Sequence, residues 1–414
     1  MKRVVITGMG LASPVGNDIG AAAEALRAGR SGIRRVPEWD SVAGLKTGVA
    51  GVVEGIDPRR IGRKFRRTMG RVALLGALSA MDAVADAGLD GGALESDRAG
   101  VSMGSTMGSA GVLERMFRDY QECGGVSSQE GTTFMRVMSH TVASNVAAML
   151  GTRGRLMAPC SACASSTQAI GFAWENIACG RQDIMVCGGA EDLHPTTAGV
   201  FDILGAASRG YNDDPASTPR PFDADRDGMV VSEGGGAVVL EEYEHALSRG
   251  ARIHGEVAGF GTCCDGRHMT SPSSGGMYRS MAEAVAAAGI SAADLDYINA
   301  HATGTSQGDA AEAAAIREFA GERVPVSGTK GYTGHTLAAS GVIEVILCLI
   351  MMREGFIAPT LNLENMDPAC AGIRHVTELA ERALRTVLSC NFAFGGVNAA
   401  LVLRKLDEGG ASGR

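Results

Sequence analysis

One cysteine stands among small residues at the predicted start of a helix. Cys163 lies in the segment Pro159-Cys160-Ser161-Ala162-Cys163-Ala164-Ser165-Ser166. A thiol at a helix N-terminus meets the positive end of the helix dipole, so we expect the pKa of Cys163 to fall below its usual value of about 8.5. The free N–H groups there can also hold a developing oxyanion. The segment therefore predicts a thiolate nucleophile.

Two histidines lie in loops rich in glycine and threonine. His301 belongs to Asn299-Ala300-His301-Ala302-Thr303-Gly304-Thr305-Ser306-Gln307-Gly308-Asp309, and His335 closes Lys330-Gly331-Tyr332-Thr333-Gly334-His335. A further glycine-rich turn is Asn391-Phe392-Ala393-Phe394-Gly395-Gly396-Val397-Asn398. One cysteine nucleophile with two loop histidines suits acyl transfer through a thioester.

These loops need a scaffold of strands and helices that brings them together. Short apolar runs alternate with longer segments of helical periodicity, which is typical of an α/β protein. The predicted strands are 3–7, 98–103, 183–187, 236–241, 295–300, 324–327, 385–390 and 397–404. The predicted helices are 71–87, 164–179, 277–288, 309–319 and 336–353.

Similarity between segments of the chain predicts two related parts. Cys163 and His335 each follow an apolar run and open a helix of similar length, and the segments 4–10 and 257–261 look alike. The predicted halves are residues 1–250, which carry the nucleophile, and residues 251–414, which carry the two histidines.

Composition excludes several classes of protein. Glycine is abundant, at 58 of 414 residues, without a collagen-like period, and this predicts many tight turns and close backbone approaches. The net charge of −8 argues against nucleic acid as a partner. Residues 1–10 lack the apolar stretch of a signal peptide, and the most apolar segment, 345–352, is far shorter than the roughly 20 residues that span a bilayer. We expect a soluble, cytoplasmic protein with reduced thiols, no membrane contact, and a frayed tail at 407–414.

Three patterns suggest cofactors but fit poorly. Gly8-Met9-Gly10 lacks the third glycine of a dinucleotide fingerprint and is better explained as a structural strand-to-loop turn. Cys160 and Cys163 form a C-x-x-C, but no second such pair follows, and the eight histidines show no metal-ligand spacing. We therefore expect no metal, and we expect Cys160 to pack beside Cys163 rather than form a redox couple with it.

Seven cations lie within thirteen residues. They are Arg59, Arg60, Arg63, Lys64, Arg66, Arg67 and Arg71. Such a run is usually a solvated helix face, but in an acidic chain a local basic patch also favours docking of an acidic macromolecule.

Four motifs in a single order carry a resemblance to a known family. They are Ser161 to Ser166 against T-A-C-x-S-G, His301 to Asp309 against H-G-T-x-T-x-x-x-D, Lys330 to His335 against K-x-x-T-G-H, and Cys390 to Asn398 against N-S-F-G-F-G-G-T-N. The chain resembles the β-ketoacyl-acyl-carrier-protein synthases of types I and II, which are elongating condensing enzymes. The resemblance implies a thiolase fold, in which two related βαβαβαββ halves form a five-layered αβαβα sandwich.

The resemblance also implies a reaction and a role for each site residue. Cys163 would accept the acyl group, the N–H groups of Cys163 and Phe394 would form an oxyanion hole, and His301 and His335 would stabilise the enolate that malonyl-carrier protein forms on losing CO₂. A network of Lys330, Asp309, Glu312 and Glu344 would order this site. Asp309 and Glu312 also read as a capping box, and Glu344 as a buried partner of a backbone group or ion.

The remaining implied roles concern substrates and partners. The phosphopantetheine arm would meet Thr270, Thr303 and Thr305, Phe392 and Phe394 would gate the pocket, and Met107 and Phe201 would line the acyl pocket. Acyl carrier protein would dock on Lys64, Arg67 and Arg209. The resemblance implies no cofactor, since the substrates are carried on the phosphopantetheine of the carrier protein. It implies a homodimer, with a heterodimer as the alternative.

The chain departs from the family pattern at several positions. They are Ser166, Ala302, Tyr332, Ala338, Ser340, Ala393 and Val397, and we expect an alanine at 393 to stiffen the gating loop if the glycine it replaces uses a positive φ. These departures leave open the chain length and whether the pathway makes fatty acids or specialised polyketides or polyenes. Two other functions stay open: a degradative thiolase with Cys390 as its second cysteine, and a non-catalytic chain-length-factor subunit.

Overall fold

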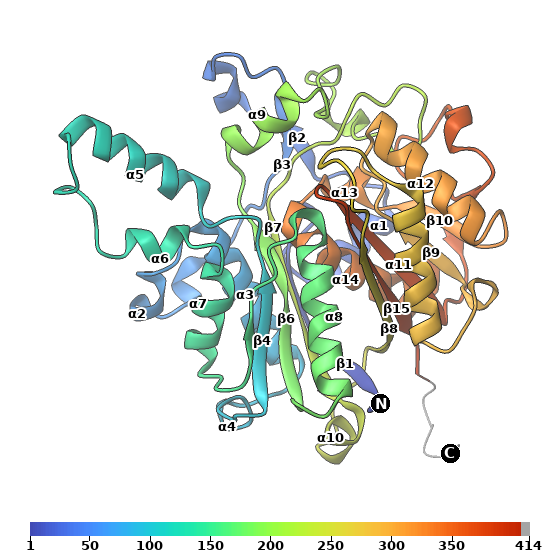
Figure 1. Ribbon diagram of the computed structural model, residues 1–414, viewed down its shortest axis with the longest axis horizontal. Helices are drawn as coiled ribbons and strands as arrows, with labels where there is room; N and C mark the ends of the chain where they lie inside the picture. The colour runs from blue at the N-terminus through green and yellow to red at the C-terminus, as the bar shows by residue number, and fades with distance from the viewer. Residues whose placement is uncertain (407–414) are drawn as a thin grey trace.

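The protein consists of two groups of strands and the helices around them (Figure 1). The structure is a computed structural model and describes residues 1–406. The predicted tail at 407–414 lies outside the described residues. The N-terminal group comprises β1 (Val4–Ala12), β4 (Ala99–Gly104), β5 (Leu156–Met157), β6 (Ile184–Glu191) and β7 (Gly234–Glu242). The C-terminal group comprises β8 (Gly255–Cys264), β9 (Tyr297–Ala300), β10 (Pro325–Gly328), β12 (Arg374–His375), β14 (Thr386–Ala393) and β15 (Val397–Arg404).

The two groups of strands have the same pattern and meet at one ladder. The strand order is β12-β10-β9-β14-β15-β8-β1-β7-β6-β4-β5. In the first group β4 pairs parallel with β6, and the next pairs, β6 with β7 and β7 with β1, are antiparallel. In the second group β9 pairs parallel with β14, and the next pairs, β14 with β15 and β15 with β8, are antiparallel. The pairs Val5 with Glu256 and Ile6 with Gly255 join β1 to β8.

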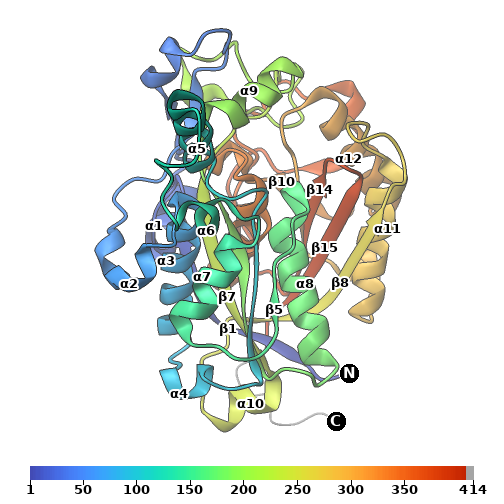
Figure 2. The ribbon, with the colours of Figure 1, turned by 60° about the vertical axis from the view of Figure 1, so that its left-hand side comes forward.

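Helices form the other layers of the sandwich. Between the two strand groups lie α8 (Ser165–Ala178) and α14 (Ser340–Glu354), and α14 is buried without a break from Ser340 to Met352. The N-terminal group is covered outside by α3 (Arg71–Asp86) and α7 (Thr141–Leu150), and the C-terminal group by α11 (Ser274–Ala287) and α12 (Ser306–Phe319). The predicted α/β thiolase fold, with its five layers, is confirmed (Figures 1 and 2).

Close backbone approach explains the Gly-Met-Gly segment. It lies within β1, so the predicted strand-to-loop turn is wrong. A Cβ on Gly8 would stand 2.0 Å from the carbonyl oxygen of Ala83, and one on Gly10 would stand 2.0 Å from that of Ser79, both in α3. Gly259 and Gly261 of β8 press against α11 in the same way. The repeated glycines therefore let the first strand of each half lie directly on its outer helix.

Most of the predicted elements are present, with three helix starts displaced. α11 begins at Ser274 rather than at residue 277. α12 begins at Ser306 rather than at residue 309. α14 begins at Ser340 rather than at residue 336, because a separate 3₁₀ turn, Leu337–Ala339, with Leu337 at φ +45°, precedes it. The strand β8 and the helices α1 (Ile19–Arg27), α5 (Ala110–Cys123), α7 and α9 (Pro195–Ile203) were not predicted. Among the described residues, no helix is both long and apolar enough to cross a membrane.

Candidate active site

The predicted nucleophile lies between the two halves. Cys163 belongs to a 3₁₀ turn, Ala162–Ala164, that leads into α8, and its side chain is 6% exposed. Its Sγ lies 2.9 Å from Nε2 of His335. Sγ and one ring nitrogen each of His301 and His335 all lie within 4.8 Å of one another. The three side chains are therefore placed to act on one reacting centre.

The resting Cys163 is a thiol rather than a thiolate. Burial raises the pKa of Cys163 to about 12, while the positive charge of Lys330 and the residue's own backbone N–H oppose this rise. The predicted lowering of its pKa is therefore wrong, because loss of hydration outweighs the helix N-terminus. The short contact with His335 supplies the base that activation then needs.

The ring of His301, just after β9, has two hydrogen-bond donors next to its Nδ1 atom. Its Nδ1 lies 3.2 Å from Nζ of Lys330 and 3.3 Å from Nδ2 of Asn391. The Asn391 amide is oriented by its Oδ1, which accepts a hydrogen bond from Thr167 at 2.5 Å. An ammonium and an amide NH₂ both donate, so Nδ1 of His301 is an acceptor and its proton lies on Nε2.

His335 is fixed through its main chain and through its second ring nitrogen. Its N–H donates to the carbonyl of Val230 at 2.7 Å, and Nδ1 lies 2.9 Å from Oγ of Ser340. Burial, and next the charge of Lys330, hold the pKa of both His301 and His335 well below the usual range. Both rings are therefore neutral at neutral pH, and each has one N–H to donate.

Lys330 and Glu344 form a buried ion pair behind His301. Their side chains are 1% and 2% exposed, and Glu344 also accepts from Nδ2 of Asn391 at 2.7 Å. Burial raises the pKa of Glu344, and Lys330 partly offsets the rise. The predicted place of both residues in a network around the histidines agrees with these contacts. The charge of Lys330 beside His301 would oppose a metal cation bound at the cysteine and the two histidines.

Asp309 and Glu312 act on the backbone of the His301 loop. Glu312 accepts from the N–H groups of His301 at 2.6 Å and Ala302 at 2.7 Å, and Asp309 accepts from those of Gly304 at 3.1 Å and Phe222 at 2.8 Å. Burial raises the pKa of Glu312 to about 8 and that of Asp309 to about 6. The predicted capping box is wrong, because the helix begins at Ser306, before either residue.

A cavity of about 360 Å³ opens onto the cysteine and the histidines. Of the predicted site residues its walls include Cys163, His301, His335, Thr270, Thr303, Thr305, Phe201, Phe392, Phe394 and Glu312. Oγ1 of Thr303 and Oγ1 of Thr305 lie 2.9 Å apart on one wall. Met107 is 42% exposed and does not belong to the described lining, so the structure does not bring it to this cavity.

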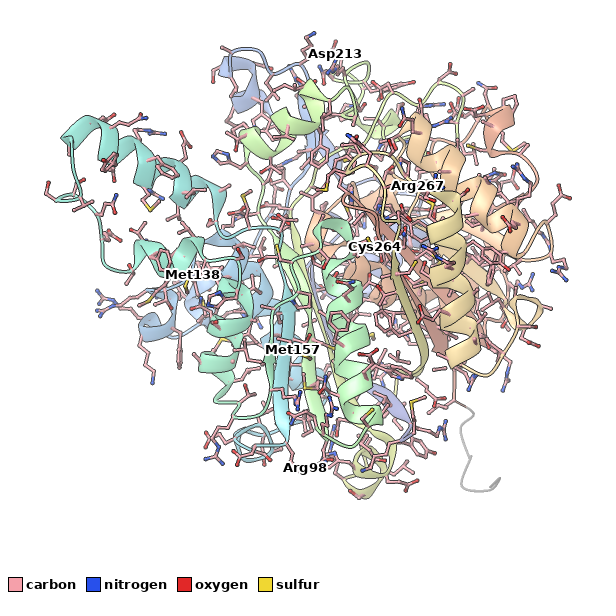
Figure 3. The ribbon with its side chains drawn as sticks, viewed as in Figure 1. Arg98, Met138, Met157, Asp213, Cys264 and Arg267 are labelled. Carbon is pink, nitrogen blue, oxygen red and sulfur yellow. The ribbon has the colours of Figure 1, made fainter. Side chains whose placement is uncertain are left out.

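The aromatic residues of the last turn lie at the mouth of the cavity. Phe394 is 38% exposed and packs against Phe201, with ring centroids 5.7 Å apart, whereas Phe392 is buried beside His301. The turn is tied to the segment after β8, since the Gly395 N–H donates to the Met269 carbonyl at 2.8 Å. Figure 3 labels Cys264, the last residue of β8, and Arg267 in that segment. Gly395 and Gly396 have positive φ, whereas Ala393 is the last residue of β14 and does not. We expected Ala393 to stiffen the loop only if position 393 used a positive φ, so that reason for stiffening is absent.

The predicted docking cations separate into two places. Lys64 and Arg67 lie in and just after α2 (Arg63–Arg66), and neither forms an ion pair with any residue from 1 to 406. Arg209 lies near α9 and pairs with the buried Asp202, Nε to Oδ1 at 2.5 Å. In Figures 1 and 2, α2 and α9 lie apart. The structure therefore does not group Arg209 with the other two.

Two contacts of the site were missed from the sequence. Asn391 was noted only as part of a turn, and its contact with His301 follows from β14 lying parallel to β9. Ser340 was noted only as a departure from a pattern. One expectation is wrong: Cys160 is exposed rather than packed. The thiolase alternative loses its second cysteine, because Cys390 is fully buried in the core and does not line the cavity.

Comparisons with known proteins agree on one family. Residues 1–246 match the β-ketoacyl synthase N-terminal domain, and residues 254–364 match the β-ketoacyl synthase C-terminal domain. The 3-oxoacyl-[acyl-carrier-protein] synthase 1 of Haemophilus influenzae is 41% identical over 98% of this chain and 99% of its own.

Solved structures give the same answer. The crystal structure of a β-ketoacyl synthase from Burkholderia phymatum is 44% identical, has a TM-score of 0.95, and is matched over 98% of this chain and all of its own. A type II polyketide ketosynthase solved with its acyl carrier protein and a bound hexaketide is 29% identical, with a TM-score of 0.89 over 98% of this chain and all of its own.

Proposed function

The chain belongs to the β-ketoacyl synthase family, and from that premise we propose how its residues divide the work of condensation. The protein is an acyltransferase that catalyses decarboxylative condensation in the elongation of fatty acids or polyketides. It needs no free cofactor, because its substrates are carried on the phosphopantetheine of acyl carrier protein.

The first half reaction transfers an acyl group to Cys163. The 2.9 Å contact between Sγ and Nε2 of His335 is the observation that carries this proposal. As sulfur attacks the thioester carbonyl, Nε2 takes the thiol proton and returns it to the departing phosphopantetheine thiol. The N–H groups of Cys163 and Phe394 stabilise the oxyanion, the first at the turn before α8 and the second at the cavity mouth.

The second half reaction forms the new carbon–carbon bond. When malonyl-carrier protein loses CO₂, the electron pair of the broken bond becomes an enolate, and Nε2–H of His301 donates to its oxygen together with His335. The enolate carbon then attacks the Cys163 thioester, the carbon–sulfur bond breaks, and Sγ leaves as a thiolate that takes a proton from water to restore the resting thiol. Lys330 and Glu344 hold His301 as a donor, while Asp309 and Glu312 fix its loop.

The remaining cavity residues bind the rest of the substrate. Thr270, Thr303 and Thr305 present hydroxyls to the phosphopantetheine arm, and Phe201 bounds the acyl chain. Phe394 opens the cavity mouth when it swings from Phe201, while Phe392 stays against His301. Met107 keeps a role in chain length only if the acyl chain extends beyond the cavity of this chain.

Acyl carrier protein is the partner of this enzyme, and its docking surface is α2. Arg63, Lys64, Arg66 and Arg67 are the cations of the basic run that form no ion pair within residues 1–406. Arg59, Arg60 and Arg71 are paired with Asp57, Asp82 and Glu233. Unpaired cations attract an acidic protein more strongly than paired ones, so Lys64 and Arg67 belong to this surface and Arg209 does not.

A second copy of the chain completes the assembly. The helices α5 and α6 (Thr133–Val137) form an arm at the side of the molecule (Figure 1). Phe117, Tyr120 and Phe134 are exposed on this arm, and Leu156 is exposed on the edge strand β5. A homodimer would bury these side chains, and a related second subunit is the alternative partner.

Residues 1–250 supply the nucleophile of each site, and residues 251–414 supply its two histidines. All ten cysteines are free, which suits the reducing cytoplasm.

Condensation assays test the proposed function. The protein should release CO₂ and form β-ketoacyl-carrier protein when given acyl- and malonyl-carrier protein. Cys163→Ala should abolish the condensed product, whereas the exposed neighbour Cys160→Ala should retain it. Equal product from Cys163→Ala would refute the role of Cys163, and a wild type that cannot be acylated would identify a non-catalytic subunit instead.

A further inference from the structure

One buried amide joins three elements around the reacting centre. Asn391 lies in β14 and is fully buried. Its Nδ2 lies 3.3 Å from Nδ1 of His301 and donates to Glu344 at 2.7 Å, and its Oδ1 accepts from the hydroxyl of Thr167 at 2.5 Å. Both polar atoms of the amide are therefore engaged.

The partners of Asn391 belong to segments that carry the site. His301 directly follows β9, and Glu344 lies in α14, which begins five residues after His335. Thr167 lies in the first turn of α8, four residues after Cys163. Asn391 therefore ties the ring of His301 to the helix that begins behind the nucleophile.

The orientation of this amide is fixed by its neighbours. After a flip, Oδ1 would face the carboxylate of Glu344 and Nδ1 of His301, and both of these are acceptors. The contact with α8 is also tightly packed, because a Cβ on Gly341 would stand 2.0 Å from Oγ1 of Thr167 and 2.9 Å from Oδ1 of Asn391. The amide therefore holds its partners in one arrangement.

Lys330 does not make the same link. Its Nζ also contacts Nδ1 of His301, but its other partner is Glu344 in α14 and not a residue of α8. The family motif N-S-F-G-F-G-G-T-N has serine where this chain has Asn391. A serine hydroxyl donates one hydrogen bond, so it cannot serve His301 and Glu344 together.

We propose that Asn391 is a positioning residue that couples the loss of CO₂ to carbon–carbon bond formation, because it holds His301 in place relative to α8. The inference rests on the proposed function. His301 donates to the enolate oxygen, so the position of its ring sets where the enolate carbon lies relative to the Cys163 thioester. An enolate that is displaced from the thioester takes a proton from water and becomes acetyl-carrier protein, while the acyl group stays on Cys163.

Asn391→Ser tests this coupling. Acylation of Cys163 should change less than about twofold, because it uses His335 as its base. With enzyme that is already acylated, formation of β-ketoacyl-carrier protein should fall about tenfold, since small displacements of a reacting group are costly, whereas release of CO₂ should fall less than about threefold. The ratio of CO₂ to condensed product should therefore rise from about one to more than about three, with acetyl-carrier protein as the additional product.

Thr167→Val cuts the same link at its other end. Valine has nearly the shape of threonine but no hydroxyl, so Oδ1 of Asn391 loses its donor in α8 while Nδ2 keeps its partners. This variant should raise the ratio of CO₂ to condensed product in the same direction and leave acylation within about twofold of wild type.

A buried asparagine far from the cavity provides the control. Asn145 lies in the outer helix α7, is 7% exposed, and donates from Nδ2 to the Thr141 carbonyl at 2.8 Å. Asn145→Ser should keep the wild-type ratio. The inference is overturned if either Asn391→Ser or Thr167→Val, shown by circular dichroism to be folded, keeps the wild-type ratio, or if it slows acylation and condensation equally. A wild type that is not acylated would instead refute the proposed function.

Discussion

Burial decides the chemistry of the single residue Cys163. The helix N-terminus that follows it and the charge of Lys330 both favour a thiolate, yet the pKa of the buried thiol rises to about 12. The type and position of the nucleophile were predictable from the sequence. Its ionisation was not, because the enclosure is built by residues from both halves of the chain.

Alkylation of Cys163 should follow the raised pKa. Only the thiolate reacts with iodoacetamide, and a thiol with a pKa of about 12 is protonated throughout the neutral range. The rate should therefore keep rising with pH to at least pH 10, without a plateau, when it is followed by peptide mass spectrometry. Glutathione provides the reference for an unburied thiol. A plateau below pH 8 would show that the helix N-terminus outweighs burial.

Ala302 carries backbone strain beside a catalytic residue. It follows His301 and has φ +44°, a region that favours glycine. Ala302→Gly should therefore raise the free energy of unfolding by about 1 kcal/mol, measured by denaturant titration. Ala339 has φ −82°, which suits any residue, so Ala339→Gly should lower the free energy of unfolding by about 0.5–1 kcal/mol. A loss of stability in Ala302→Gly would mean that Glu312 already compensates the strain.

At the scale of elements, strand ends and helix starts determine which side chains meet. Short apolar runs and segments of helical periodicity were enough to predict most of the longer strands and five of the helices, because these elements pack in the core. The contact of Asn391 with His301 was not predictable in this way, since it joins residues 90 positions apart through the pairing of β14 with β9. The error over Arg209 has a different cause: its ion pair with Asp202, seven residues earlier in the chain, is a side-chain contact that the pattern of elements does not predict.

The helix α2 should govern affinity for acyl carrier protein. Reversing two unpaired charges with Lys64→Glu and Arg67→Glu should raise KM for acyl-carrier protein at least tenfold, because attraction becomes repulsion. Small acyl thioesters, which do not touch α2, should keep their KM. Arg59→Glu and Arg60→Glu, which alter cations already paired with Asp57 and Asp82, should have smaller effects. Equal losses with both substrate classes would exclude a docking role.

At the scale of the molecule, the site exists because the two halves meet. Cys163 precedes α8, His335 precedes α14, and these two helices form the central layer (Figure 1). The likeness of residues 4–10 to 257–261, together with the similar helices that follow Cys163 and His335, predicted two related halves. The cavity between them could not be predicted, because its walls come from turns spread over the whole length of the chain.

The exposed arm should determine the oligomeric state. Phe117 and Phe134 are 55% and 69% exposed on α5 and α6, so Phe117→Asp with Phe134→Asp should convert a dimer into monomers in sedimentation experiments, without loss of helical signal. Glu122→Asp, a mild change on α5, is the control. A wild type that sediments as a monomer alone, and as a dimer only with a related chain, would identify a heterodimer.

The most direct measurement is intact-protein and peptide mass spectrometry after mixing with acyl-carrier protein. One acyl group should appear, on the peptide that contains Cys163, and it should disappear on addition of malonyl-carrier protein as a β-ketoacyl product two carbons longer forms. An acyl group on Cys160, no acyl group at all, or an acyl group that persists when malonyl-carrier protein loses CO₂ would contradict the account.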